Sequence, residues 1–313
     1  EIASCLVGSE MCIRDSYEAV KCGTIRAAAE KMAIAPSAIS RQIALLEEEL
    51  SVALLERNRR GIVPTAAGLL LIDYARQQQA HRADMLSKID LMRGLRSGSV
   101  SVVTGEGFVQ DLVRGPLRRF RQQYPEITVS VDITGTTEIL RRISEDDAEL
   151  GLVYNAPADS RIVTRGACVQ PMCAIVGNSH ALGNAPHVEF EELTRWPVAL
   201  MNGSYGIRQL LGHVEYSRKI RLDAVLTTNQ ISVLKAFVAT GQGITLLPPF
   251  SISHELSLGE LHAIPILDGT LRSAEAHLIT RAGRHLSPAA NQFVAFCLRD
   301  MAAFRLPAAD APR

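Results

Sequence analysis

Apolar residues recur at helical spacing in the first quarter of the chain. One set, whose members are three or four positions apart, consists of Ile25, Ala28, Ala29 and Met32. Thr24 can cap the amino end of this helix, because its hydroxyl can accept a hydrogen bond from the first turn. After a turn at residues 33–35, a second helical pattern opens with Pro36, whose missing N–H is harmless at a first helical position. The pattern predicts two helices joined by a short turn.

The second helix has an apolar side and a polar side. Its apolar positions are Ala38, Ile39, Ile43, Leu46 and Leu50. Its first two turns carry the polar residues Ser37, Ser40, Arg41 and Gln42. A helix in the major groove reads base edges with side chains from these turns, and hydroxyl, guanidinium and amide groups suit that role. The alternative is a solvated charged face, which the same residues and the glutamates that follow them also fit.

A two-stranded wing is predicted after this helix, from residues 54–57 and 62–65 around a basic tip. Arg59 and Arg60 at the tip would reach phosphates or the minor groove, whose negative potential favours guanidinium groups. The predicted DNA interface consists of Thr24, Ser37, Ser40, Arg41, Gln42, Arg59 and Arg60.

Thr65 can cap a long helix that runs to about residue 94. Residues near one side of this linker helix are Leu69, Ile72, Arg76, Gln79, Met85, Ile89 and Met92. An apolar seam of this length favours pairing with a second helix over packing on its own chain.

Strand and helix patterns alternate beyond a hinge at residues 94–98. The expected strands are 100–104, 128–134, 150–154, 173–176, 198–201, 225–228 and 244–247, with helices between them. Alternation of this kind predicts parallel α/β units. The patterns form two sets, of which the second begins near Ile162.

Three segments resemble the LysR-type transcriptional regulators. AAAEKMAIAPSAISRQIALLEEELSVALLERNRRGIVPTAAG at 27–68 is similar to their winged helix-turn-helix, and RFRQQYPEITV at 119–129 and GQGITLLPP at 241–249 are similar to their effector domain. The resemblance covers about residues 17–300. It implies an all-α winged helix-turn-helix with a linker helix that pairs with a second subunit, followed by a two-lobed α/β domain of the periplasmic-binding-protein type, with a small effector in its cleft.

The domain boundaries follow from these patterns and from the resemblance. Residues 1–16 have neither a clean helical period nor the features of a signal peptide, and we set them aside as an anomalous segment. The expected parts are a DNA-binding domain at 17–64, a linker at 65–97, a first lobe at 98–161 plus 266–303, and a second lobe at 162–265.

The resemblance places the effector cleft at strand ends and helix starts. Its candidate residues are Thr104, Glu106, Thr136, Thr137, Asn202, Ser204, Thr228 and Asn229. Helix amino ends suit a carboxylate ligand, although the hydroxyl and amide residues would also serve simply as helix caps. If Glu106 points into the cleft, an effector with an amine or hydroxyl groups is expected. If it points outward, a simple organic acid remains open.

Composition narrows the possible functions. The 313 residues include 33 Lys+Arg and 33 Asp+Glu, so attraction to DNA must come from a local patch. The six cysteines show neither zinc-site nor disulfide-scaffold spacing, and no catalytic or nucleotide-binding motif is present, so we expect no metal, no cofactor, no catalytic residue and a reducing cytoplasm. No apolar run reaches the roughly 20 residues that span a bilayer, so no membrane association is expected.

The sequence therefore predicts a cytoplasmic regulator that binds double-stranded promoter DNA as a homo-oligomer, a dimer or a tetramer built as a dimer of dimers, and responds to a small molecule. RNA polymerase is a candidate further partner. The alternative is a solute-binding protein of a transport system, which would account for residues 98–300 but needs export and gives residues 17–94 no role.

Overall fold

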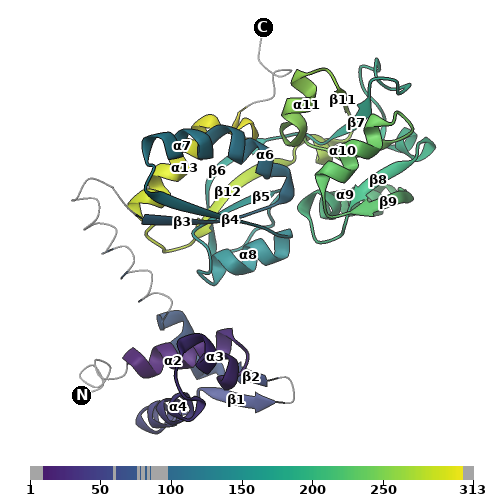
Figure 1. Cartoon of the computed structure of the whole chain (residues 1–313). Coiled ribbons are helices and arrows are strands. Elements are labelled where there is room, and N and C mark those ends of the chain that lie inside the picture. Colours follow the sequence, from purple (N-terminus) through teal and green to yellow (C-terminus); the bar gives the residue numbers. More distant parts are fainter. Residues whose placement is uncertain are drawn as a thin grey trace. The chain divides into compact units, whose positions relative to one another are not determined.

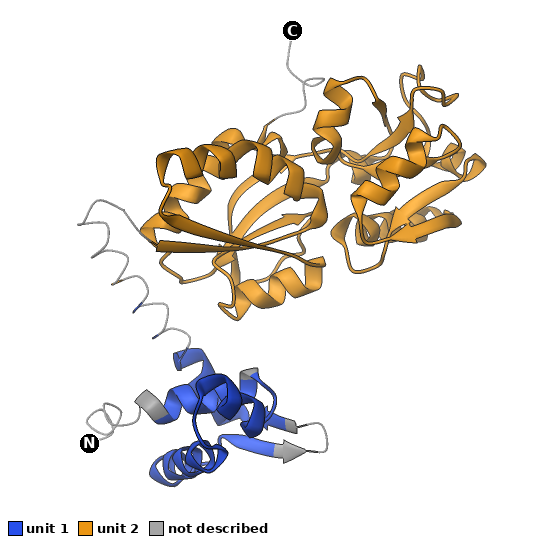
Figure 2. Ribbon diagram, viewed as in Figure 1, with its two compact units in different colours: residues 1–83 blue, residues 84–313 orange. Residues whose placement is uncertain are grey.

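The chain forms two compact units, Glu1–Ala83 and Asp84–Arg313 (Figures 1 and 2). The structure is a computed structural model, and it describes residues 10–58, 61–75, 78, 82, 85 and 98–305. Each unit has buried apolar clusters of its own, and each is considered by itself.

The amino-terminal unit consists of helices and a two-stranded wing (Figure 1). Its elements are α2 (Glu10–Lys21), α3 (Ile25–Met32), α4 (Pro36–Leu50), β1 (Leu55–Asn58), β2 (Gly61–Pro64) and a helical stretch at 66–75. One cluster beneath the helices contains Ala19, Ala28, Ala29, Ile39 and Ile43. The predicted pair of helices and the wing are therefore present, with the apolar side of α4 turned inward.

Setting residues 1–16 apart from the fold was wrong for residues 10–16. They form the first turns of α2, and Ile13 and Ser16 are buried. Ile13 and Tyr17 are four positions apart on this helix and pack with Leu46 and Leu54 in one cluster. The core of the unit is incomplete without these residues.

The predicted seam of the linker helix also needs correction. Ile72 is only 4% exposed and packs with Ala75 into the core of its own unit. Leu69 and Leu70 point outward instead, and Met85 is exposed. Four other expected seam residues, Arg76, Gln79, Ile89 and Met92, lie outside the described residues. The helical stretch at 66–75 therefore has two apolar sides, and one of them is already buried in the core of its own unit.

The carboxy-terminal unit contains two five-stranded sheets, which define its two lobes. The sheet of lobe I has the order β4 (Ile127–Ile133), β3 (Gly98–Thr104), β5 (Leu150–Tyr154), β12 (Glu275–Arg281) and β6 (Ile162–Val169). The sheet of lobe II has the order β11 (Leu261–Pro265), β7 (Cys173–Gly177), β10 (Ile244–Leu247), β8 (Val198–Met201) and β9 (Ala224–Thr228).

Helices cover both faces of the lobe I sheet. The helical elements of this lobe are a 3-10 turn (Glu106–Phe108), α6 (Val109–Leu112), a π-turn (Val113–Leu117), α7 (Arg118–Gln123), α8 (Thr136–Ser144), α13 (Pro288–Asp300) and a 3-10 turn (Ala302–Phe304). Figure 1 shows α7 and α13 on one side of the sheet and α8 on the other. Side chains alternate along β3, so Val102 packs in the cluster of Phe120 and Phe293 while Val103 packs with Ile139.

Helices connect the strands of lobe II along the chain. Its helical elements are a 3-10 turn (Phe190–Arg195), α9 (Gly206–Arg218), α10 (Ile231–Ala239), a 3-10 turn (Pro249–Ile252), α11 (Ser253–Ser257) and α12 (Gly269–Arg272). Every residue of β7, β8 and β10 is buried. These three strands correspond to the apolar runs expected from the sequence, whereas β11 and the short α11 and α12 were not predicted.

The boundary between the lobes differs from the expected one. β6 was assigned to the second lobe, but it pairs with β12 in the sheet of lobe I. The sheets are also mixed, because β12 runs antiparallel to both β5 and β6, and β7 runs antiparallel to β10 and β11. Lobe II therefore begins after β6, and only the central βαβ units are parallel as predicted.

Candidate functional sites

The start of α4 presents polar side chains to solvent. Ser37 and Arg41 are exposed, while Ile39 and Ile43 on the same turns are buried. Ala35 precedes the helix without a side-chain cap, so Pro36 opens it alone. Within the described part of the chain Arg41 has neither a hydrogen-bond nor an ion-pair partner, which leaves its guanidinium free to bind an external acceptor.

The other predicted DNA-binding residues are placed differently. The Thr24 hydroxyl accepts a hydrogen bond from the Ala27 amide at 3.1 Å and caps α3. Ser40 is half-buried, and the Gln42 side-chain oxygen accepts a hydrogen bond from the Cys12 thiol of α2 at 2.7 Å. Gln42 therefore faces α2. Arg59 and Arg60 lie outside the described residues.

A glutamate that the sequence reasoning passed over ties the wing to α4. Glu47 Oε1 accepts hydrogen bonds from the Leu54 and Leu55 amides, at 2.7 and 3.1 Å. The Ile62 amide of β2 also donates to the Gly23 carbonyl at 2.9 Å, just before α3 begins. These bonds fix the base of the wing against the same helices that carry Arg41.

Four of the predicted cleft residues lie at or beside the contact between the two lobes of the carboxy-terminal unit. The Thr136 amide, in the first turn of α8 in lobe I, donates to the Ser204 carbonyl of lobe II at 2.8 Å. Asn202 Oδ1 accepts from the Ser204 amide and hydroxyl, at 3.1 and 2.6 Å. The Asn202 amide in turn donates to the Thr228 carbonyl at 2.9 Å. The structure thus joins four of the predicted residues in one chain of hydrogen bonds.

Close backbone packing accompanies this chain of hydrogen bonds. A Cβ atom on Gly206 would lie 2.2 Å from the Tyr154 carbonyl oxygen and 3.0 Å from Thr136 Oγ1. A Cβ atom on Gly135 would lie 2.6 Å from the Ser204 carbonyl oxygen. The lobes can approach this closely only because both positions are glycine.

Glu106 makes a second bridge between the lobes. Its Oε2 accepts a hydrogen bond from the Ile231 amide at 2.8 Å, at the amino end of α10. Burial raises the pKa of Glu106, against the smaller opposing effects of this hydrogen bond and of Lys235 on α10. A carboxyl group of the protein itself therefore occupies a helix amino end, the kind of position that would also suit a ligand carboxylate.

Three of the cleft candidates, Thr104, Thr137 and Asn229, are not part of these bridges. Thr104 is fully buried at the end of β3, and its hydroxyl donates to the Gly105 carbonyl at 3.0 Å. Thr137 and Asn229 are exposed. The Thr228 hydroxyl accepts from the Gln230 amide at 3.1 Å in the turn before α10, whose N-cap residue, Gln230, provides no side-chain cap.

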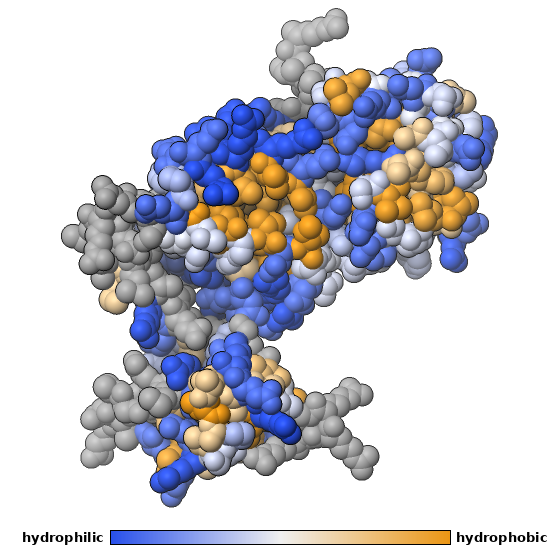
Figure 3. Space-filling model, viewed as in Figure 1, coloured by the Kyte–Doolittle hydropathy of each residue, from blue (hydrophilic) through white to orange (hydrophobic). Residues whose placement is uncertain are grey.

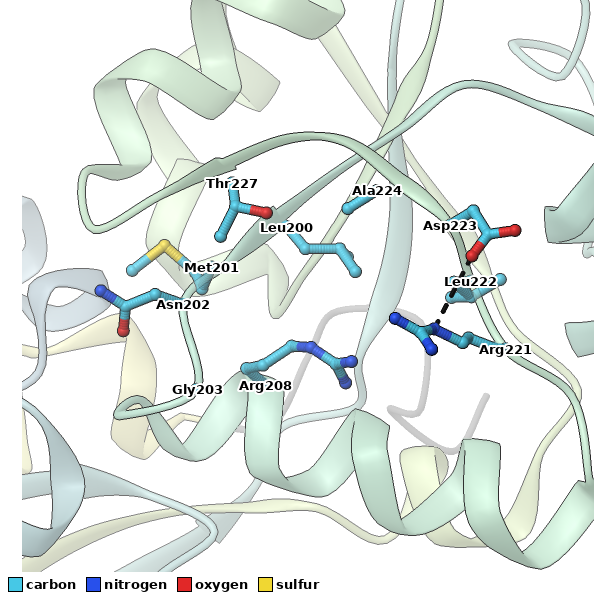
Figure 4. Close-up of a pocket in the computed structure, with 10 residues that line it drawn as sticks. All are labelled: Leu200, Met201, Asn202, Gly203, Arg208, Arg221, Leu222, Asp223, Ala224 and Thr227. Atoms are coloured by element: carbon cyan, nitrogen blue, oxygen red, sulfur yellow. Dashed lines mark ion pairs between the residues drawn. The ribbon is translucent and has the colours of Figure 1, made fainter.

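A hollow of about 340 Å³ lies within lobe II (Figure 4). It is lined by Leu200, Met201, Asn202, Gly203, Arg208, Arg221, Leu222, Asp223, Ala224 and Thr227. Among the predicted effector residues only Asn202 lines it. Arg208 and Arg221 were missed, because they lie on different elements, the helix α9 and the loop before β9, and belong to no motif. Within the described residues no cluster of three metal-ligating side chains occurs, and no helix is long and apolar enough to cross a membrane.

Comparison with known protein families adds an independent observation. A family model described as the LysR substrate binding domain matches residues 93–302, and one described as bacterial regulatory helix-turn-helix protein, lysR family, matches residues 14–69. The chain is 27% identical over 304 residues to the HTH-type transcriptional regulator CbbR of Sinorhizobium medicae, covering 95% of each chain.

Solved structures show the same fold. A full-length OxyR from Pseudomonas aeruginosa matches with a TM-score of 0.70 at 16% identity, covering 97% of this chain and 98% of the other. Full-length CbnR in complex with its target DNA matches with a TM-score of 0.52 at 20% identity, covering 93% and 98%.

The contact between the lobes leads to a first prediction. Gly206→Ala should lower the free energy of unfolding of the two-lobed unit by about 1–3 kcal/mol, because the new Cβ would overlap the Tyr154 carbonyl. Gly269→Ala is the matched control, since a Cβ there has no neighbour within 4 Å. Urea denaturation measures both variants. Equal stability of the two would show that the lobes do not press together at Gly206.

A second prediction concerns pH. The folded protein holds the Glu106 proton more tightly than the unfolded chain does, because burial raises its pKa. Glu106 therefore stabilises the fold most below about pH 4.3, and this contribution is lost as the pH rises through the raised pKa. The stability of the wild type relative to Glu106→Gln should therefore fall as the pH rises above about 4.3.

The control for this measurement is Glu260→Gln, which alters an exposed glutamate of the same unit. Its stability should follow that of the wild type across the pH series. A constant difference between the wild type and Glu106→Gln would mean that the Glu106 carboxyl is not buried between the lobes in solution.

Proposed function

Since this chain belongs to the LysR family of helix-turn-helix regulators, we propose that it binds promoter DNA through α4 and the wing and changes its activity when a small molecule binds between the lobes. The main support for DNA binding is that α4 has a buried apolar side and, in its first two turns, an exposed polar side. Arg41 is exposed there and has no partner among the residues that the structure describes, and such a guanidinium can donate two parallel hydrogen bonds to a guanine edge.

A regulatory role also agrees better with the whole chain than the alternatives do. A transport-associated solute-binding protein would leave the helix-turn-helix at 14–69 without a task. The matched relative is a transcriptional regulator, and we propose a role without catalysis, in the cytoplasm. The ligand-responsive part is then the two-lobed unit that matches the substrate-binding family model.

We propose that the effector is a polar molecule with an amine or hydroxyl groups. Glu106 already places a carboxylate at the start of α10, where it would repel a second carboxylate. The hydroxyl and carbonyl groups around Thr136 and Ser204 can instead serve as partners for donors on a ligand.

The oligomer is proposed to form through apolar surfaces that the single chain leaves uncovered. On the amino-terminal unit a hollow of about 320 Å³ is lined by Leu50, Val52, Leu54, Ala67, Leu70, Leu71 and Tyr74. Leu70 at its rim is 76% exposed. Such a surface fits the linker helix of a second copy.

Further apolar side chains are exposed on the other unit, where Figure 3 shows them gathered on both lobes. Ile133 and Val225 are exposed on β4 and β9, the outer strands of the two sheets. Unpaired outer strands with apolar side chains favour association. Two separate association surfaces support a tetramer built from dimers.

The DNA-binding proposal is tested with Arg41→Ala. Selection from random duplexes first identifies a preferred site for the wild type. The variant should bind this site about 10- to 100-fold more weakly while its binding to scrambled DNA changes little, because a base contact is worth about 1–3 kcal/mol of discrimination. Gel-shift titration measures both affinities.

The matched control is Arg26→Ala, because Arg26 is exposed on α3 and pairs with Glu30. It should retain specific binding. An equal loss on specific and scrambled DNA would assign Arg41 to a phosphate contact, and failure to select any site would contradict DNA recognition itself.

Association through the linker helix is tested with Leu70→Asp. The introduced carboxylate would be buried without a partner in the interface, at a cost of about 3–5 kcal/mol, so sedimentation equilibrium should show a smaller assembly. Leu258→Asp is the control, because Leu258 is a similarly exposed leucine in lobe II. Ile72 is unsuitable, since it lies in the domain core. An unchanged mass for Leu70→Asp would place the association elsewhere.

A further inference from the structure

The hollow in lobe II has the size of a small ligand site. Its volume of about 340 Å³ lies near the lower end of the range for small-molecule pockets, about 300–1,000 Å³. All of its lining residues come from β8, the turn after β8, the first turn of α9, the loop before β9 and β9 itself. It is therefore a cavity of lobe II alone, distinct from the contact between the lobes.

Two arginines give the hollow its charge. Figure 4 shows the Arg208 and Arg221 side chains turned toward the same space, one from α9 and the other from the loop before β9. The one carboxylate in the lining is that of Asp223, and it is 3.7 Å from Arg221 in a pair that is almost fully exposed. Such a pair is weak, so the charge of Arg221 has little compensation, whereas Arg208 forms an ion pair at 2.8 Å with Glu215, which does not line the cavity.

Arg208 is held in place from behind. Its Nη1 donates to Glu215 Oε2 at 2.8 Å, and Glu215 Oε1 accepts from the Leu222 amide at 3.0 Å. Glu215 is itself largely buried and does not line the hollow. Glu215 thus holds the guanidinium of Arg208 through one nitrogen. The other N–H groups of this guanidinium stay available to a ligand.

The rest of the wall is apolar with a polar rim. Leu200, Leu222 and Ala224 supply carbon surface, and Asn202 and Thr227 supply hydrogen-bonding groups. Small residues keep the space open, since a Cβ on Gly203 would have no neighbour within 4 Å. The lining therefore matches a molecule that has an anionic head and a short apolar body.

We propose that this hollow is a second ligand site, which binds a small organic acid through Arg208 and Arg221. Carboxylate and phosphate head groups share the chemistry that a guanidinium fork recognises. The site goes beyond the proposed effector cleft, but the two are connected. Asn202 lines the hollow and also holds Ser204, whose carbonyl accepts the Thr136 amide of lobe I. An acid in the hollow can therefore influence the contact between the lobes.

Calorimetric titration of the full chain with pentanoate, inorganic phosphate and pentanamide tests the proposal. Pentanamide has the size of pentanoate without its charge, so pentanoate should bind at least about tenfold more tightly. Tighter binding of pentanoate than of phosphate would show that the site takes a carboxylate head group. Tighter binding of phosphate would show that it takes a phosphate head group. Equal binding of pentanoate and pentanamide, or binding of neither anion, would overturn the proposal.

Two variants locate the binding. Arg221→Gln should weaken binding of the anion about tenfold, and it is expected to fold because the side chain is 87% exposed. Ala224→Leu should weaken it as well by filling the hollow without changing charge. Arg195→Gln is the control, since Arg195 is an exposed arginine of lobe II outside the lining, and it should bind as the wild type does.

Thr136→Val separates this site from the effector cleft. The substitution removes a hydroxyl at the contact between the lobes and leaves the hollow unchanged. Retained binding in Thr136→Val together with loss in Arg221→Gln and Ala224→Leu supports the second site. Loss in Thr136→Val with full binding in the other two would overturn it and place the acid between the lobes, which leaves the proposed function standing.

Discussion

The contact between the strand ends of the two lobes organises the ligand-responsive unit. The Thr136 amide donates to the Ser204 carbonyl, and Gly206 packs on the Tyr154 carbonyl at a distance that excludes any side chain. Because the contact is made by backbone groups, it fixes the relative position of α8 and the turn after β8. The effector cleft, the Glu106 bridge and the wall of the lobe II hollow all depend on that position.

Charge is used locally in this protein. Lysine and arginine balance aspartate and glutamate over the whole chain, so attraction to an anion must come from a local group. Among the described residues Arg41 at the start of α4 has no partner, and Arg221 has a weak exposed pair beside the hollow. Glu106 differs from these arginines, because its carboxyl group already has a partner within the chain, the Ile231 amide at the start of α10.

The DNA-binding unit shows how one helix serves the core and the surface. The buried side of α4 packs against α2 and α3, and its carboxy-terminal Glu47 holds the first strand of the wing. The same helix presents Ser37 and Arg41 to solvent. The orientation of the polar start is therefore set by apolar packing and not by the polar residues themselves.

The sequence by itself determined the elements whose signal is local. β5, β8 and β10 have the predicted bounds, because a fully buried strand appears as an uninterrupted apolar run. The order of helix, turn, helix and wing followed from caps, spacing and Pro36, and family membership followed from that motif.

Tertiary structure alone decided which elements meet. β6 belongs to lobe I because β12, more than a hundred residues later, returns to pair with it. Ile72 is buried because Tyr17 and Leu54 are brought beneath it, and Gln42 turns toward α2 because Cys12 lies there. Arg208 and Arg221 face one hollow only after α9 has packed beside the sheet. The periodicity of apolar residues predicts one helix or strand at a time. It therefore cannot predict which separate elements contact each other.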